Sequence, residues 1–257
     1  MPELPDLQVF SKNLNRMIKG KTLEKAIIHN KQKIKVKEAE LQALEGKTLN
    51  KVFRRGKRLF LDFGKDTILA IHLMLHGKLE YSDTPDPKYA LVSLTFKGGK
   101  ILSVTDFQQM ANIELNPPSA EAIDALSPQL TADKLEQLLQ ASRAKIKTVL
   151  MDQKLIGGIG NAYADEILHA AQLSPLSIAG KIPQKKVQQL AKAIKDVLED
   201  AERQIQKTHP DIISGEVRDF LKVHRKQAKH DASGQTIKQT KVGGRITYYT
   251  ADQEEFS

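Results

Sequence analysis

Between the two ends of the chain, the hydrophobic pattern changes its period once, at a stretch rich in proline. Between Lys21 and Thr105 the apolar residues form short β-rich runs separated by glycines, a pattern that predicts strands. The runs are Ile34–Val36, Leu59–Phe63, Thr67–Leu73, Ala90–Phe96 and Ile101–Val104. Breaker residues at Asn116–Ser119 and Leu126–Pro128 then predict a linker. Helical spacing follows over Thr131–Ala141, Ser142–Gln153, Asn161–Ala171 and Pro183–Lys207. We therefore expect an α+β fold with more than one domain.

The two ends of the chain carry their own signals. Pro5 suits the first turn of a helix, Asp6 suits its positive end, and Gly20 ends the helical spacing. Near the other end, Gly243 and Gly244 lie between two β-rich runs and predict a β-hairpin. The runs are Thr236–Val242 and Arg245–Thr250. The expected domains are an N-terminal β-sandwich with an N-terminal helix over 1–118, a helical domain over 129–221 and a C-terminal hairpin over 222–257.

Charge and composition narrow the class of partner. The 40 basic and 31 acidic side chains give a formal net charge of +9, which favours an anionic polymer such as nucleic acid. The absence of cysteine excludes disulfides, thiolate zinc sites and cysteine nucleophiles. No run of about 18 apolar residues is present, so we expect a soluble cytoplasmic protein, associated with the nucleoid if bacterial, with no membrane partner. No motif predicts a cofactor.

The first three residues can supply a reactive amine. If Met1 is removed, Pro2 becomes a free secondary amine, and an α-amino group is about one-third neutral at pH 7.5 whereas a lysine is almost fully protonated. A secondary amine that adds to an aldehyde-type carbon forms an iminium, which makes a neighbouring C–H acidic, and such chemistry cleaves at sugars. Glu3 could serve as the acid or base. Met-Pro starts are common, however, and the motif needs support from the rest of the chain.

Two internal stretches could bind phosphate. Four cations surround one glycine in Arg54-Arg55-Gly56-Lys57-Arg58, which is either a phosphate site or a solvated basic surface. The run from Asp152 to Glu166 holds three glycines and then opens a predicted helix, so its backbone amides could approach a phosphate. A plain glycine-rich connection between helices is the alternative.

The whole Asp152–Glu166 run resembles the helix-two-turn-helix signature of the formamidopyrimidine-DNA glycosylase and endonuclease VIII family. Pro2-Glu3-Leu4-Pro5 resembles the mature N-terminus of these repair enzymes, and Arg55-Gly56-Lys57 resembles their strand lysine motif. The resemblance extends from Pro2 to the terminal hairpin. It implies a β-sandwich and a helical domain with double-stranded damaged DNA bound in the cleft between them, by a protein that acts as a monomer.

The resemblance also implies roles for particular residues. Pro2 is the expected nucleophile, Glu3 the acid or base, and Lys57 the cation near the scissile backbone, while Arg245 grips a phosphate. The other expected DNA contacts are Arg55, Gly158, Gly160, Asn161, His72, Leu75, Gln108 and Met110. Leu75 occupies the position of an apolar wedge that enters the duplex where the damaged nucleotide leaves, although an apolar strand end is the alternative interpretation.

Several departures from the family pattern limit what the resemblance implies. The four zinc-binding cysteines of the family hairpin correspond here to His230, Ser233, Thr250 and Gln253, which cannot form a normal zinc site. We therefore predict a zincless finger that gains its order from packing, with His224 and His230 facing DNA or solvent.

Other departures concern the residues that recognise the damaged base and the base opposite it. The second wedge loop reads Asp106-Phe107-Gln108-Gln109-Met110-Ala111 and lacks the arginine that reads the widowed cytosine. The segment from His209 to Phe220 looks short for the loop that covers 8-oxoguanine, and Asp6 and Gln8 replace usual glutamates. The expected function is a DNA glycosylase and abasic-site lyase. The alternative is a damage-binding DNA protein that has lost base excision.

Overall fold

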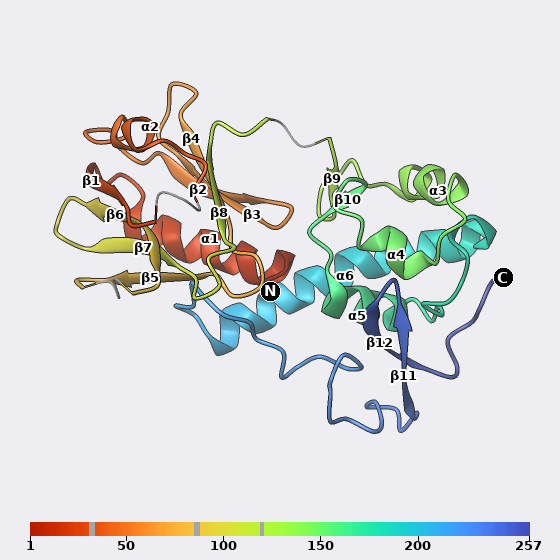
Figure 1. The fold of residues 1–257 in the computed structure, drawn as a ribbon. Coiled ribbons are helices and arrows are strands. Elements are labelled where there is room, and N and C mark those ends of the chain that lie inside the picture. The colour runs from red at the N-terminus through yellow and green to blue at the C-terminus, as the bar shows by residue number, and fades with distance from the viewer. Residues whose placement is uncertain (31–33, 85–87, 119–120) are drawn as a thin grey trace. The chain divides into compact units, whose positions relative to one another are not determined.

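A computed structural model describes residues 1–30, 34–84, 88–118 and 121–257 (Figure 1). The chain divides into two compact units. The first contains Met1–Ser119 together with Ile205–Glu216, and the second contains Ala120–Gln204 together with Val217–Ser257. The terminal hairpin is thus part of the same compact unit as the helices that precede it.

Helix α1 (Leu4–Ile18) anchors the N-terminus to the first unit. Its buried apolar face includes Leu7, Phe10 and Leu14, and each fully buried side chain of this kind contributes about 1.5–3 kcal/mol relative to exposure. Asn15 fixes the helix to the neighbouring strand, because its Oδ1 accepts the backbone N–H of Val52 at 2.8 Å. The predicted N-terminal helix is confirmed.

Two four-stranded antiparallel sheets form the rest of the first unit. The first sheet has the order β1 (Leu23–Ile28), β6 (Ala90–Phe96), β7 (Ile101–Thr105) and β5 (Lys78–Ser82), and the second has the order β2 (Lys51–Arg55), β3 (Arg58–Asp62), β4 (Ile68–His72) and β8 (Asn112–Leu115). Alternate residues such as Leu59 and Leu61 of β3, and Leu94 and Leu102 of the other sheet, belong to one buried cluster. This shared core confirms the predicted β-sandwich.

One predicted strand is wrong. Residues Ile34–Val36 form no strand, although both apolar side chains are buried in the core. The two β-branched side chains anchor a loop to the core, and the short helix α2 (Glu38–Gln42) follows it. Two buried apolar side chains on either side of a polar residue gave the same alternating pattern as a half-buried strand.

The second unit is mainly helical. Strands β9 (Ile123–Asp124) and β10 (Ile156–Gly157) pair in parallel, and the helices are α3 (Ala132–Gln140), α4 (Ile146–Leu150), α5 (Asn161–Ala170), the 3₁₀ turn η1 (Ala179–Lys181) and α6 (Gln184–Thr208). Helix α4 is shorter than the predicted Ser142–Gln153. The Asp152 carboxylate accepts the backbone N–H of Lys154 at 2.9 Å, which favours a turn over further helix.

The predicted hairpin is present in the second unit. Strands β11 (Ile237–Val242) and β12 (Arg245–Thr250) pair in antiparallel register, and Gly243 and Gly244 have φ angles of +54° and +75°. Positive φ at both turn positions is the geometry that suits a two-residue hairpin and favours glycine. Within the described part of the chain, no helix is long and apolar enough to cross a membrane.

The segment after α6 packs on the β-sandwich. Asn13 Nδ2 donates to the carbonyl of Ile212 at 2.7 Å, and the backbone N–H of Leu79 donates to Ser214 Oγ at 3.1 Å. The side chains of Ile212 and Ile213 pack against the core. The first part of the predicted short lesion-covering loop is therefore packed within the first unit.

Candidate DNA interface and active site

The N-terminal pair of candidate catalytic residues is buried. Pro2 is buried, and Glu3 is only 4% exposed at the N-cap of α1. The backbone N–H of Glu3 donates to Asp6 Oδ2 at 2.8 Å, one half of a capping box between these two residues. Asp6, one of the departures from the family pattern, thus fixes the direction of the chain at Glu3.

The cationic candidates Arg55 and Lys57 flank Gly56 at the turn between β2 and β3. Arg55 is exposed, whereas Lys57 is 9% exposed. Arg54 is directed toward helix α1, since its Nε donates to Gln8 Oε1 at 2.9 Å. The turn therefore presents one solvent-facing cation and one buried cation.

His72 lies at the end of β4, within electrostatic range of this turn. Burial is the largest cause that lowers the pKa of His72 to about 4, and the positive charges of Arg58 and Lys57 act in the same direction, against Glu114. His72 is therefore neutral near pH 7. A neutral imidazole still offers one N–H to a phosphate without adding charge.

We expect His72 to make the folded protein sensitive to acid. Its pKa is lowered in the folded state relative to the unfolded value near 6.5. The unfolded chain therefore binds the extra proton first, and stability is retained above about pH 6.5 and falls toward pH 4. Urea unfolding measures the free energy of unfolding at each pH. In His72→Gln, the fall in this free energy between about pH 6.5 and pH 4 should be smaller than in the wild type by on the order of 2 kcal/mol. The exposed His209→Gln is the control, and equal pH slopes for the two variants would contradict the assignment.

The turn at 73–77 presents the candidate wedge Leu75. Leu73 is buried, Met74 has a φ of +54°, and Leu75 is 58% exposed. The backbone N–H of Gly77 donates to the carbonyl of Leu73 at 2.8 Å, and a Cβ at Gly77 would lie 2.2 Å from that oxygen. Only glycine permits this closure, so the tight turn forces Leu75 outward.

The loop at 106–111 is organised by a buried carboxylate. Asp106 is 1% exposed and accepts the backbone N–H groups of Gln108, Met110 and Ala111 at 2.8–2.9 Å. Asn30 also donates to Gln109 Oε1 at 2.7 Å. The loop has a defined shape, with Met110 54% exposed.

In the second unit, the glycine-rich run is pinned by Gln153. Its Nε2 donates to the carbonyl of Ile159 at 2.8 Å, and its Oε1 accepts the N–H of Gly158 at 3.0 Å. Gly158 has a φ of +111°, and Gly160 is the N-cap of α5. This conformation places the start of the helix, whose dipole favours an anion, beside Asn161.

Asn161 and Arg245 are brought together by the hairpin. Asn161 Nδ2 donates to the carbonyl of Ile246 at 3.0 Å, and Arg245 is the exposed neighbour of Ile246 in β12. The two candidate phosphate ligands, which lie far apart in the sequence, thus occupy one region of the second unit.

A buried ion pair holds the hairpin against helix α5. Lys147 Nζ lies 2.7 Å from Asp165 Oδ1, and both side chains are fully buried. Lys147 also donates to Thr247 Oγ1 at 2.8 Å, while Asp165 Oδ2 accepts the N–H of Tyr248 at 3.0 Å. His224 Nδ1 lies 2.7 Å from the same carboxylate oxygen. The buried Lys147–Asp165 pair therefore helps to fix strand β12, and with it the position of Arg245.

Hydrogen bonds occupy the positions that correspond to the family's zinc ligands. Thr250 and Gln253 are buried, and Gln253 Oε1 accepts the N–H of Thr250 at 2.7 Å while its Nε2 donates to Leu173 at 2.8 Å. Burial raises the pKa of Asp231, but hydrogen bonds, led by Ser233 and His169, lower it to about 2. Among the described residues, no cluster of three or more His, Asp or Glu could hold a metal.

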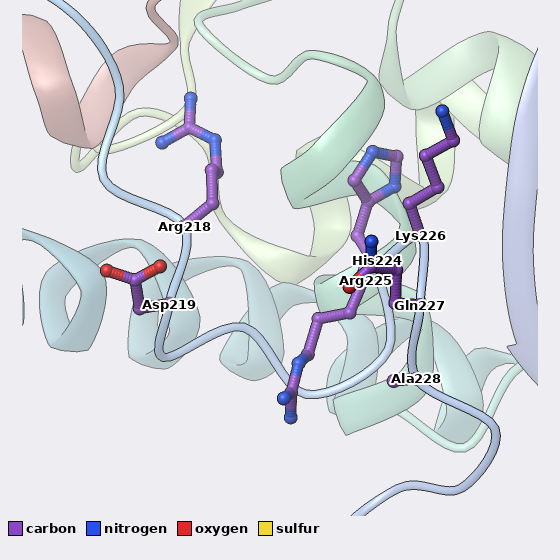
Figure 2. A pocket seen from close by; sticks show the side chains of 7 residues that line it. All are labelled: Arg218, Asp219, His224, Arg225, Lys226, Gln227 and Ala228. Atoms are coloured by element: carbon purple, nitrogen blue, oxygen red, sulfur yellow. The ribbon is translucent and has the colours of Figure 1, made fainter.

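A cavity of about 510 Å³ lies beside His224 (Figure 2). Figure 2 shows the side chains of Arg218, Arg225 and Lys226 pointing in different directions around it, with Asp219 as the one carboxylate. The guanidinium of Arg218 lies 5.2 Å from the centre of the Tyr163 ring. Three cations against one anion give this part of the second unit an affinity for negative charge.

Comparison with known proteins assigns the chain to a family. The model of the formamidopyrimidine-DNA glycosylase N-terminal domain matches residues 1–113, and the model of the H2TH domain of the same glycosylase matches residues 122–211. The chain belongs to the formamidopyrimidine-DNA glycosylase family. A formamidopyrimidine-DNA glycosylase of Pelotomaculum thermopropionicum is 31% identical with 97% of each chain covered, and one of Xanthomonas campestris is 30% identical with 98% covered.

Solved structures of the family have the same fold. The Lactococcus lactis protein in complex with DNA containing an abasic site superposes with a TM-score of 0.86, at 24% identity, covering 97% of this chain and 98% of that one. A second complex, of the same protein with tetrahydrofuran-containing DNA and an inhibitor, gives a TM-score of 0.88. At this identity the likeness establishes the fold, as the sequence predicted.

The candidate residues fall into two groups. The first unit holds Pro2, Glu3, Arg55, Lys57, His72, Leu75, Gln108 and Met110, and the second holds Gly158, Gly160, Asn161 and Arg245. Sequence reasoning missed Asp106 and the Lys147–Asp165 pair, which position candidate ligands from beneath. A buried lysine within a helix leaves no local signal, because lysines are usually exposed.

Proposed function

We propose that Pro2, freed by removal of Met1, is the nucleophile with which this protein excises a damaged base from double-stranded DNA. The protein is a DNA glycosylase of base excision repair with an associated abasic-site lyase activity. The proposal for Pro2 rests on one observation: Pro2 and Glu3 are buried together at the start of α1, in the domain that matches the family model.

The proposed chemistry follows from an amine and a carboxyl group. The Pro2 nitrogen bonds to the sugar C1′ of an extruded nucleotide, and the base leaves with the electrons of the glycosidic bond and the proton that the amine releases. Glu3 then protonates the ring oxygen, so the C1′–O4′ bond breaks and the nitrogen lone pair completes the iminium. The resulting iminium makes the C2′ hydrogen acidic. Its loss expels the 3′ phosphate, and a further elimination expels the 5′ phosphate.

Phosphate binding is proposed for cations of both units. In the first unit we assign Arg55, Lys57 and neutral His72 to the DNA backbone. In the second unit we assign Asn161, Arg245 and the amides of Gly158 and Gly160. We propose that the protein acts as a monomer on double-stranded DNA in the cytoplasm, and at the nucleoid if the source is bacterial.

A damage-binding protein without base excision is the second candidate. The glutamine-rich 106–111 loop and the anchored 209–216 segment favour it, since both differ from a loop set that reads and covers an oxidised purine. Duplexes carrying 8-oxoguanine, formamidopyrimidine, thymine glycol, dihydrouracil or an abasic site separate the two functions. Release of any free base supports excision, and cleavage of the abasic duplex alone supports a lyase without it.

We predict little dependence on the base opposite the lesion. An arginine offers a rigid fork of donors, whereas the exposed Gln108 carries one donor end and one acceptor end and can suit several bases. Loss of a good bidentate contact removes about 1–3 kcal/mol of discrimination. Single-turnover rates with A, C, G and T opposite one lesion should agree within about tenfold. A larger preference for cytosine would mean that another residue reads it.

A further inference from the structure

A carboxylate from a distant part of the sequence lies at the N-terminal amine. The amine of Met1 donates to Oε1 of Glu216 and forms an ion pair with it, across 215 positions of the chain. Both residues belong to the first unit. Their side chains are 34% and 36% exposed, so water screens the pair only in part. The chemistry proposed above does not involve Glu216.

The segment that carries Glu216 is fixed to the β-sandwich. Ser214 Oγ accepts the backbone N–H of Leu79 at 3.1 Å, and the side chain of Ile213 packs against the core. Gly215 then has a φ of +89°, a conformation that favours glycine and redirects the chain between Ser214 and Glu216. The carboxylate is therefore presented by an anchored backbone, one residue after a turn.

The other charged groups near the terminus belong to α1 and to the strands packed on it. Glu3 and Asp6 of α1 are engaged with each other's backbone in the capping box. The strands contribute positive charges, which include Arg54, bound to the helix, and the buried Lys57. Positive charges favour a neutral amine, whereas the negative charge of Glu216 favours the protonated form.

We propose that Glu216 is a positioning residue for the Pro2 amine in the processed protein. This inference rests on the proposed function, in which removal of Met1 frees Pro2. Successive backbone nitrogens lie at most roughly 3.8 Å apart, so the anchored carboxylate stays within reach of the new terminus. A neutral secondary amine has one N–H and one lone pair. When Glu216 accepts the N–H, the lone pair is left free for the sugar carbon.

The same carboxylate complements the positive charge that the Pro2 nitrogen carries. It favours the protonated amine before the attack, and it lies beside the positive iminium after it. Both effects are electrostatic, so they depend on the sign of the charge at position 216. Neither effect depends on the damaged base, because the contact is made with the nucleophile.

The test is the pH dependence of strand cleavage on an abasic-site duplex in a single turnover. This substrate has no damaged base, so a role of Glu216 in covering the lesion would not affect the result. The acid limb of the profile reports the pKa of the nucleophilic amine. Glu216→Gln should move this limb about 0.5 pH unit lower and slow the plateau about two- to fivefold. Glu216→Lys should move the limb further in the same direction.

Asp211→Asn is the matched control, because it removes a carboxylate of the same segment, whose ion pair with Arg16 measures 2.5 Å. Its pH profile should match that of the wild type. Mass spectrometry should show that every variant lacks Met1, and thermal unfolding should show that each is folded.

An acid limb that does not move lower in Glu216→Gln and Glu216→Lys would overturn the assignment, as would an equal displacement in Asp211→Asn. Failure of the proposed function would be seen separately, as a wild-type protein whose borohydride adduct does not map to Pro2.

Discussion

Replacing Pro2 with glycine is expected to slow strand cleavage at an abasic site by on the order of 100-fold or more, the range found when a group that acts in the transition state is lost. Glycine keeps a terminal amine but loses the ring that fixes its direction, and its primary amine gives an imine that must hold a proton to act as an electron sink. Single-turnover rates on an abasic-site duplex measure the effect.

Borohydride trapping identifies the nitrogen that reacts. With the wild type, the covalent adduct should map to the peptide that begins at Pro2. Pro5→Ala is the matched control, because Pro5 stands in the first turn of α1 and has no proposed chemical role. Trapping of the glycine variant at the wild-type rate through a lysine would show that the nucleophile has been misassigned.

Replacing Lys147 with alanine is expected to cost about 3–5 kcal/mol of unfolding free energy. The change leaves Asp165 charged, fully buried and without the ammonium group 2.7 Å away. Urea unfolding at neutral pH measures the loss. The exposed Lys154→Ala serves as the control and should change stability by less than about 0.5 kcal/mol.

A double substitution shows how much of the stability loss comes from the unpaired charge and how much from lost packing. Lys147→Met combined with Asp165→Asn removes both charges and keeps similar volumes, so it should recover much of the stability that Lys147→Ala loses. We also expect Lys147→Ala to bind DNA more weakly than the wild type does. The ammonium group donates a hydrogen bond to the carbonyl of Ile246, the neighbour of Arg245 in β12. A cost below about 1 kcal/mol for Lys147→Ala would mean that water or another group compensates Asp165.

The sequence alone was sufficient wherever structure depends on neighbours along the chain. Helix α1 follows from apolar residues at helical spacing between Pro5 and Gly20, and the terminal hairpin follows from two adjacent glycines. Local hydrogen bonding and backbone sterics determine these elements. The family motifs are equally local, so the order of residues along the chain is enough to single out Pro2, Lys57 and Asn161.

Tertiary structure decided what depends on residues distant in the chain. The pattern of Ile34–Val36 predicted a strand, but the structure has none at these residues, and the two apolar side chains instead anchor a loop to the core. Phe107 meets His76, and Lys147 meets Asp165 beneath the hairpin. No periodicity records these contacts, because packing selects them only after the elements have formed. The physical reason is that a side chain's role depends on its burial and its charge partners, and both are properties of the folded chain.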